Sequence, residues 1–198
     1  MRGLLLTVCI ALAFPAMAQD LLLPDRPRVR IDTSEGTIVI ELDAQRAPLT
    51  SENFIRYVRE GFYEGLIFHR VVAGFVAQGG GYTTDHTLRE PKRDPVPNEA
   101  GNGLSNLRGT VGMARTSKPH SATTQFYFNL ADNEDLDPLP TRWGYAVFGT
   151  VIDGLDVIDR MANIPTGPSL KSDELTDSVP EKEIVIKSMV FLNPLGGG

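Results

Sequence analysis

The sequence FHRVVAGFVAQGG, at residues 68–80, decides how the rest of the chain is interpreted. It predicts two strands, 66–72 and 75–78, the second of which ends at consecutive glycines. Residues two apart on a strand share a face, which puts Arg70 in apolar surroundings. An arginine buried there without a partner is costly, and the amide of Gln78 is a candidate partner to hold it. The other interpretation is an arginine that buries its stem and keeps its guanidinium in solvent, as isolated charged residues usually do.

Alternation of apolar and polar residues predicts short strands on both sides of this stretch. Before it we expect a hairpin and then a helix that begins at Pro48 and ends at Gly61. After it we expect a long proline-rich loop, three short strands, a helix after Gly154, a second loop and a final strand. These elements cover 29–31, 38–42, 82–108, 110–114, 125–130, 145–151, 157–161, 164–181 and 184–192. Many short strands with two amphipathic helices indicate a mainly β domain, either a barrel or a sandwich, with helices over its open ends.

Length and composition restrict both the fold and the partners. A chain of 198 residues is about the length of one domain, and 41% hydrophobic with 22% charged residues is typical of a globular one. The net charge of −6 argues against nucleic acids and anionic membrane surfaces, which attract basic proteins. We expect a monomer, because no large apolar stripe suggests a dimer.

The first residues predict an export signal rather than part of the fold. Arg2 precedes an apolar run at 4–14 and a small-x-small pattern at 16–18, so we predict a signal peptide over 1–18 with cleavage after Ala18. The apolar run is too short for a membrane span, which needs about 20 residues. The only cysteine, Cys9, lies within the signal, so the mature chain suits an oxidising compartment, best a bacterial periplasm. The predicted domains are 1–18 signal peptide, 19–28 linker, 29–193 folded domain and 194–198 flexible tail.

Three further stretches belong with residues 68–80. They are GTVGMAR at 109–115, SATTQFYF at 121–128 and GYAVFG at 144–149. In order and spacing the four stretches resemble the cyclophilin family of peptidyl-prolyl cis-trans isomerases, in its bacterial secreted branch, from about Val29 to Leu192. The resemblance implies a closed antiparallel eight-stranded barrel capped by two α-helices. It also implies an isomerase that acts on Xaa-Pro bonds of unfolded or partly folded exported proteins and assists their folding.

The resemblance assigns roles residue by residue. Arg70 matches the catalytic arginine, Gln78 the glutamine that orients it, and Phe75 the aromatic wall of the proline pocket. The matches to the substrate groove are His69, Val76, Ala114, Arg115, Thr116, Gln125, Tyr127, Leu136 and Tyr145.

Two positions depart from the family pattern. Tyr127 stands where phenylalanine is usual, and its hydroxyl needs a partner or a water molecule if it is buried. Asp135 stands where many eukaryotic members carry a tryptophan that binds cyclosporin, so we expect weak or no cyclosporin binding. Trp143 is close in sequence and is a candidate to supply part of the missing wall.

The residues also make chemical sense for rotation about an Xaa-Pro bond. When the bond twists, the nitrogen lone pair localises, and a fixed donor such as the Arg70 guanidinium gains strength only in that twisted state. No bond breaks, so we expect no nucleophile, metal or cofactor.

Other chemistries are less consistent with the sequence. The three histidines, His69, His86 and His120, have no metal-ligand spacing, and the acidic stretch 132–137 lacks the EF-hand pattern. A hydrolase is disfavoured, because no G-x-S-x-G elbow is present. A binding module that holds proline-containing segments as a chaperone, with little turnover, stays open as the alternative.

Overall fold

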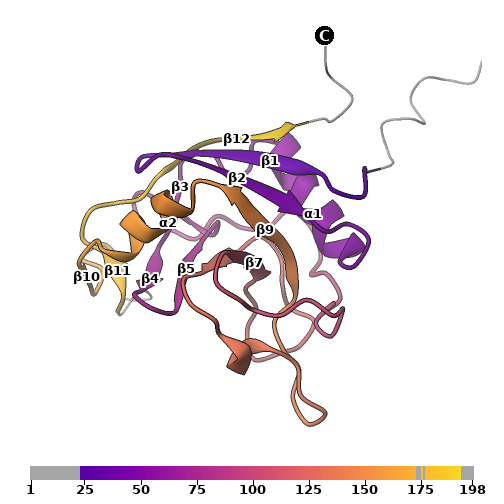
Figure 1. Ribbon diagram of the computed structural model, residues 1–198. Coiled ribbons are helices and arrows are strands. Elements are labelled where there is room, and N and C mark those ends of the chain that lie inside the picture. The colour runs from indigo at the N-terminus through magenta and orange to yellow at the C-terminus, as the bar shows by residue number, and fades with distance from the viewer. Residues whose placement is uncertain (1–22, 173–174, 176, 193–198) are drawn as a thin grey trace, which may run out of the picture.

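The computed structural model describes residues 23–172, 175 and 177–192 (Figure 1). The predicted signal peptide and the flexible tail lie outside these residues. Eight strands form one antiparallel sheet in the order β12-β1-β2-β9-β7-β8-β5-β4. Their bounds are β1 (Arg28–Thr33), β2 (Thr37–Leu42), β4 (Arg70–Val72), β5 (Val76–Gly79), β7 (Thr110–Met113), β8 (Phe126–Asn129), β9 (Val147–Asp153) and β12 (Ile186–Leu192). The predicted mainly β, eight-stranded antiparallel architecture is confirmed.

The sheet curls, and a short segment just before β4 bridges its two edge strands, β12 and β4. Strand β3 (Leu66–Ile67) lies directly before β4 in the chain. The backbone N–H of Gly65 donates to Ile186 O at 2.9 Å, and that of Phe68 donates to Ile184 O at 2.9 Å. The curled sheet is therefore held across its gap by hydrogen bonds from β3 and its neighbours to the start of β12.

Two α-helices pack against the sheet, as predicted. Helix α1 (Pro48–Arg59) begins at a proline and packs against β12. Helix α2 (Leu155–Ala162) follows Gly154, whose φ of 86° is a left-handed conformation, and packs against β2, β4 and β5. A 3₁₀ turn, η2 (Glu134–Leu136), completes the helical elements of the described residues.

The hydrophobic core combines aliphatic side chains with a cluster of aromatic rings between α1 and the sheet. Phe54 of α1 is fully buried between Phe126 and Phe148, with ring centroids 5.4 Å and 5.2 Å away. Phe68 stacks on Phe128 at 5.7 Å. These rings remove a large apolar area from water, and they fix the positions of β8 and β9 relative to α1.

The structure subdivides some predicted elements. The strand expected over 66–72 is interrupted at Phe68 and His69, because β3 pairs with β6 (Tyr82–Thr83) whereas β4 pairs with β5. The loop expected over 164–181 contains a small pairing of β10 (Thr166–Gly167) with β11 (Val179–Pro180). The long loop after residue 82 is otherwise as predicted.

Strand register places four residues in one row across the sheet. Arg70 on β4 faces Gln78 on β5, Gln78 faces Tyr127 on β8, and Tyr127 faces Gly112 on β7. Directly paired residues project from the same face of a sheet. This row brings segments distant in sequence to one place on the outer face.

Candidate active site

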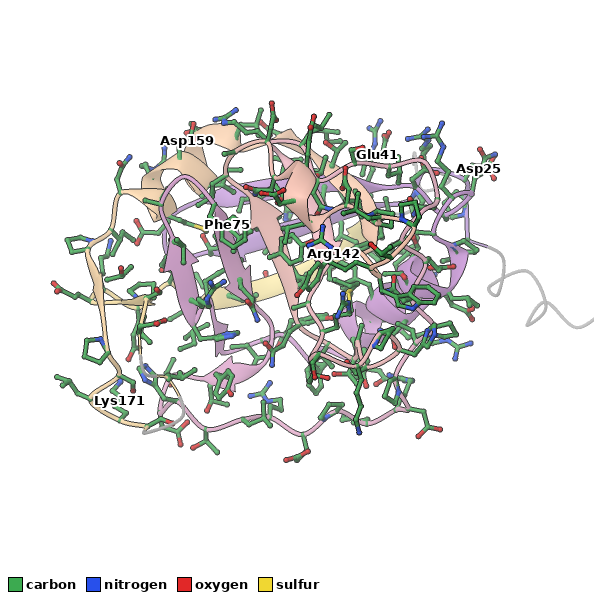
Figure 2. The ribbon with its side chains drawn as sticks, turned by 90° about the horizontal axis from the view of Figure 1, so that it is seen from below. Asp25, Glu41, Phe75, Arg142, Asp159 and Lys171 are labelled. Carbon is green, nitrogen blue, oxygen red and sulfur yellow. The ribbon has the colours of Figure 1, made fainter. Side chains whose placement is uncertain are left out.

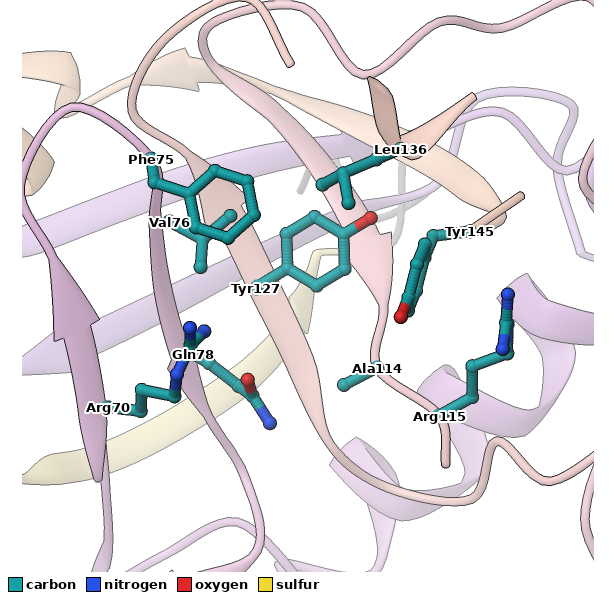
Figure 3. Close-up of a pocket in the computed structure, with 9 residues that line it drawn as sticks. All are labelled: Arg70, Phe75, Val76, Gln78, Ala114, Arg115, Tyr127, Leu136 and Tyr145. Atoms are coloured by element: carbon teal, nitrogen blue, oxygen red, sulfur yellow. The ribbon is translucent and has the colours of Figure 1, made fainter. Parts of the chain in front are cut away.

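A cavity of about 250 Å³ lies over this row. It is lined by Arg70, Phe75, Val76, Gln78, Ala114, Arg115, Tyr127, Leu136 and Tyr145 (Figure 3). All nine residues are among those that the sequence indicated. Phe75 lies near the middle of the face seen from below (Figure 2).

Arg70 places a guanidinium group at the edge of the cavity. Its guanidinium carbon lies 5.9 Å from the centre of the Phe75 ring, a distance at which a cation is attracted to an aromatic face. Within the described residues the guanidinium makes no hydrogen bond. The predicted bond from Arg70 to the Gln78 amide oxygen is not formed; the Gln78 side chain instead uses its Nε2 to donate to Gln125 Oε1 at 2.9 Å. Gln78 thus lies beside Arg70 across the strand pair, and the guanidinium donors stay available to a ligand.

The opposite side of the cavity is apolar. Phe75, Val76 and Leu136 surround the ring of Tyr127, which is 4% exposed and forms the floor. Its hydroxyl donates to Asn106 Oδ1 at 2.6 Å, so the partner that the sequence required for a buried phenol is a protein group. Burial raises the pKa of Tyr127 well above its usual value, which keeps the phenol neutral at all physiological pH values.

Arg115 holds the far wall in place. Its Nε donates to Gly144 O at 3.2 Å and its Nη2 donates to Trp143 O at 2.8 Å. The guanidinium carbon also lies 4.2 Å above the ring of Tyr145. These contacts fasten the loop before β9 to the end of β7, so Tyr145 lines the cavity in a fixed orientation.

A second, smaller cavity of about 160 Å³ continues from the first. It shares Gln78, Ala114 and Arg115 with the first cavity and adds Thr116 and Gln125, which the sequence also indicated. Ser121 and Thr123 complete its lining. This extension is polar, whereas the main cavity is walled by apolar rings, so the two suit different parts of one chain-like ligand.

The sequence model for the cyclophilin type peptidyl-prolyl cis-trans isomerases matches residues 28–190. This chain belongs to the cyclophilin family. It is 44% identical over 190 residues to peptidyl-prolyl cis-trans isomerase A of Dickeya dadantii, covering 94% of this chain and 96% of that protein. It is 44% identical over 164 residues to peptidyl-prolyl cis-trans isomerase B of Escherichia coli, covering 81% of this chain and 97% of that one. Isomerisation of peptidyl-prolyl bonds is the activity of this cyclophilin.

Solved structures agree with the fold. A cyclophilin type isomerase from Cryptosporidium parvum superposes with a TM-score of 0.67 at 27% identity, covering 85% of this chain and 98% of that one. The same protein in the presence of the dipeptide Ala-Pro gives a TM-score of 0.66 at 28% identity, covering 84% and 99%.

Two expected positions in this cyclophilin are different in the structure. His69 lines neither cavity; it lies at the break between β3 and β4 and is buried. It is 3% exposed, its ring lies 4.6 Å from that of Tyr82, and within the described residues its Nδ1 has no hydrogen-bond partner. Burial lowers the pKa of His69 to about 4, so the ring is neutral at pH 7.

Trp143 does not replace the missing wall of the cleft. Trp143 is 49% exposed, and its ring lies 4.9 Å from that of His120. It lines a separate surface hollow with Pro138, Leu139 and Pro140. Asp135 is exposed on η2, so no aromatic group occupies its position.

One functional contact has no precursor in the sequence analysis. Asn106, in the long loop after β6, accepts a hydrogen bond from Tyr127 at the floor of the pocket. No periodicity in that loop marks any residue as buried. The only signal was indirect, since a buried Tyr127 had to find a partner somewhere.

Neither a metal site nor a membrane span is found in the part of the chain that the structure describes. No three histidine, cysteine or acidic side chains gather there as metal ligands would. None of the helices in these residues combines the length and the apolar character needed to cross a bilayer.

Proposed function

We propose that this cyclophilin accelerates rotation about Xaa-Pro bonds by directing the guanidinium of Arg70 at the proline nitrogen. The observation that carries the proposal is a permanent cation, without a hydrogen bond to any described residue, beside a cavity walled by apolar rings. The barrier to rotation of about 18–20 kcal/mol arises mainly from lost amide resonance. As the amide twists, its nitrogen becomes a better acceptor, so a fixed donor stabilises the twisted form more than either planar form.

The apolar walls hold the proline ring while the preceding carbonyl swings. Phe75, Val76 and Leu136 offer a surface that fits a saturated five-membered ring, and Tyr127 closes it below. Exclusion of water also favours the twisted amide, which is less polar than the planar one. The polar extension past Gln125 would then accept the chain that precedes the ring.

No single contact supplies the whole acceleration. A hydrogen bond to a charged donor contributes about 1.5–3 kcal/mol, and each 1.36 kcal/mol changes the rate by about tenfold. Arg70 alone therefore accounts for roughly one to two orders of magnitude. The remainder comes from desolvation and from walls that are already in place before the substrate binds.

We further propose that the substrates are exported, partly folded proteins in a bacterial periplasm. Residues 1–18 have the basic start, apolar run and small-x-small site of a cleaved signal. Xaa-Pro isomerisation takes tens to hundreds of seconds without catalysis, slow enough to limit folding. A cyclophilin in that compartment would shorten this step for newly exported chains.

The test is the cis-trans exchange of an Ala-Pro peptide, measured by NMR. We expect Arg70→Ala to lower kcat/KM by at least tenfold and Arg70→Lys to recover little of it, because an ammonium lacks the planar fork of donors. Arg30→Ala, at an exposed arginine of β1, serves as the matched control and keeps wild-type exchange. Exchange by Arg70→Ala within twofold of wild type would show that the guanidinium is not the donor.

The amount of protein needed distinguishes an enzyme from the alternative, a proline-binding module with little turnover. A catalyst accelerates a proline-limited refolding reaction at a small fraction of the client concentration. A binding module would need equimolar protein to have an effect.

A further inference from the structure

Behind the floor of the proline pocket lies a cluster of buried asparagines. Asn106 and Asn129 are fully buried and Asn133 is 9% exposed. Buried amides are costly unless their hydrogen bonds are satisfied, and satisfied networks hold their members in one geometry. The partners of this cluster therefore show what it fixes.

Asn106 is the member that touches the pocket floor. Its Oδ1 accepts the Tyr127 hydroxyl at 2.6 Å and the Asn129 Nδ2 at 3.2 Å. Its Nδ2 donates to Asp137 Oδ1 at 2.8 Å, and its backbone N–H donates to the same oxygen at 2.8 Å. Asp137 thus determines which way the Asn106 amide points, so that its oxygen faces the phenol.

The same cluster is connected to the other walls. Asn133 Nδ2 donates to Phe75 O at 2.8 Å and to Asn129 Oδ1 at 2.8 Å. The backbone N–H of Leu136 donates to Asn133 O at 2.8 Å. Floor and walls are therefore joined through one set of buried amides.

Gly112 makes room for this arrangement. It faces Tyr127 in the strand register, and a Cβ at residue 112 would lie 2.3 Å from both Cζ and the hydroxyl oxygen of that ring. A Cβ atom essentially never lies within 3.0 Å of such a neighbour, so any side chain there would displace the ring. The phenol reaches Asn106 because β7 has no side chain at this point.

We infer that Asn106, oriented by Asp137, is a positioning residue of the isomerase and sets the floor of the proline pocket through the Tyr127 hydroxyl. The inference rests on the proposed function of the cavity. Without Asn106 the buried phenol loses its partner, and the open space toward which the ring can turn for water is the cavity itself. The ring would then occupy the volume that the proline needs.

The test is a double-mutant cycle on Ala-Pro exchange, with Asn106→Ala, Tyr127→Phe and the combined variant. We expect Asn106→Ala to lower kcat/KM by about tenfold while Tyr127 is present, mainly through KM. In the Tyr127→Phe background the same change should cost less than about twofold, because a phenyl floor needs no hydrogen-bond acceptor. Asn102→Ala is the matched control, because the Asn102 side chain donates a hydrogen bond to the Val147 carbonyl at a place outside the cleft.

Each outcome decides the inference. An equal loss in both backgrounds, or Asn106→Ala within twofold of wild type, would show that Asn106 does not act through Tyr127. If Asn106→Ala does not fold, the cycle is run with Asp137→Ala at the edge of the cluster, where a threefold loss that disappears with Tyr127→Phe is expected. If the wild type does not accelerate Ala-Pro exchange, the proposed function is refuted. That outcome is distinguishable from an active wild type in which Asn106 and Tyr127 do not couple, which would refute only the inference about Asn106.

Discussion

A single residue, Arg70, shows how the site reconciles charge with an apolar setting. The guanidinium lies over the edge of a cavity near the Phe75 ring, which offers partial electrostatic compensation without using a hydrogen-bond donor. A carboxylate partner would have cancelled the charge and occupied the donors. The absence of such a partner among the described residues leaves the donors free for a transient acceptor.

His69, next to Arg70, makes folding stability depend on pH. Burial lowers its pKa to about 4 from an ordinary 6.5, so the unfolded chain binds a proton there more readily than the folded one. The native state is therefore favoured above pH 6.5, and this contribution is lost as the pH falls from 6.5 to about 4. By linkage the loss approaches about 3 kcal/mol.

The measurement is urea unfolding of wild type and His69→Gln between pH 7 and pH 4. We expect the free energy of unfolding of the variant to fall less steeply with acid than that of the wild type. His120→Gln serves as the control for a histidine change at the surface. Parallel pH dependences for wild type and His69→Gln would contradict the assignment.

Asp135 governs a different residue-scale property, the binding of cyclosporin. Its carboxylate is exposed on η2, offers neither an N–H donor nor an aromatic face, and Trp143 lies elsewhere. We expect weak or no cyclosporin binding by the wild type and an affinity at least tenfold higher for Asp135→Trp, by isothermal titration calorimetry. Tight binding by the wild type would refute this expectation.

At the scale of elements, residue patterns predicted the positions of the strands and helices but not which strands pair with each other. Alternation located β1 and β2, since each has one buried face, an apolar run located β12, and Pro48 marked the start of α1. The break between β3 and β4 was not predictable, because apolar residues continue through Phe68 while the pairing partner changes. The cavity residues on strands were predicted from a resemblance to a family pattern. Asn106 lies in a loop outside the stretches that carry that pattern.

The start of α1 is completed by a residue far away in sequence. The helix has neither a side-chain cap at Ala47 nor an acidic residue in its first turn. Glu99 fills this role, accepting the N–H of Leu49 at 3.0 Å and that of Thr50 at 2.8 Å. A carboxylate at a helix N-terminus satisfies free N–H groups and complements the helix dipole.

We expect Glu99→Ala to lower the free energy of unfolding by about 2 kcal/mol, and Glu99→Gln by about 1 kcal/mol. The amide protons of Leu49 and Thr50 should exchange faster with solvent in both variants. Glu52→Ala, at an exposed glutamate paired with Arg56 on the same helix, is the control. A loss for Glu99→Ala no larger than for Glu52→Ala would exclude the capping role.

At the scale of the whole molecule, the long loop between β6 and β7 links the core to the site. The second half of this loop caps α1 through Glu99 and, seven residues later, supports the pocket floor through Asn106. Loop length and proline content predicted irregular structure here, but hydrogen bonds across 20 to 50 positions leave no periodic trace in a sequence. The loop is therefore part of the catalytic scaffold rather than a simple connection.

The last whole-molecule prediction concerns the proposed export, which we assign to a signal in residues 1–18. Cleavage after Ala18 requires small side chains at the positions before the cut, so Ala18→Phe should leave an unprocessed precursor. We expect the full-length chain, made in a bacterial host, to appear in the periplasmic fraction with Gln19 as its first residue by N-terminal sequencing. Ala11→Leu, which keeps the run apolar, is the control and should be processed normally. If Cys9 is removed with the proposed signal, the unfolding midpoint of the exported chain should be the same with and without reductant. A cytoplasmic product that begins at Met1 would contradict the assignment of both the signal and the compartment.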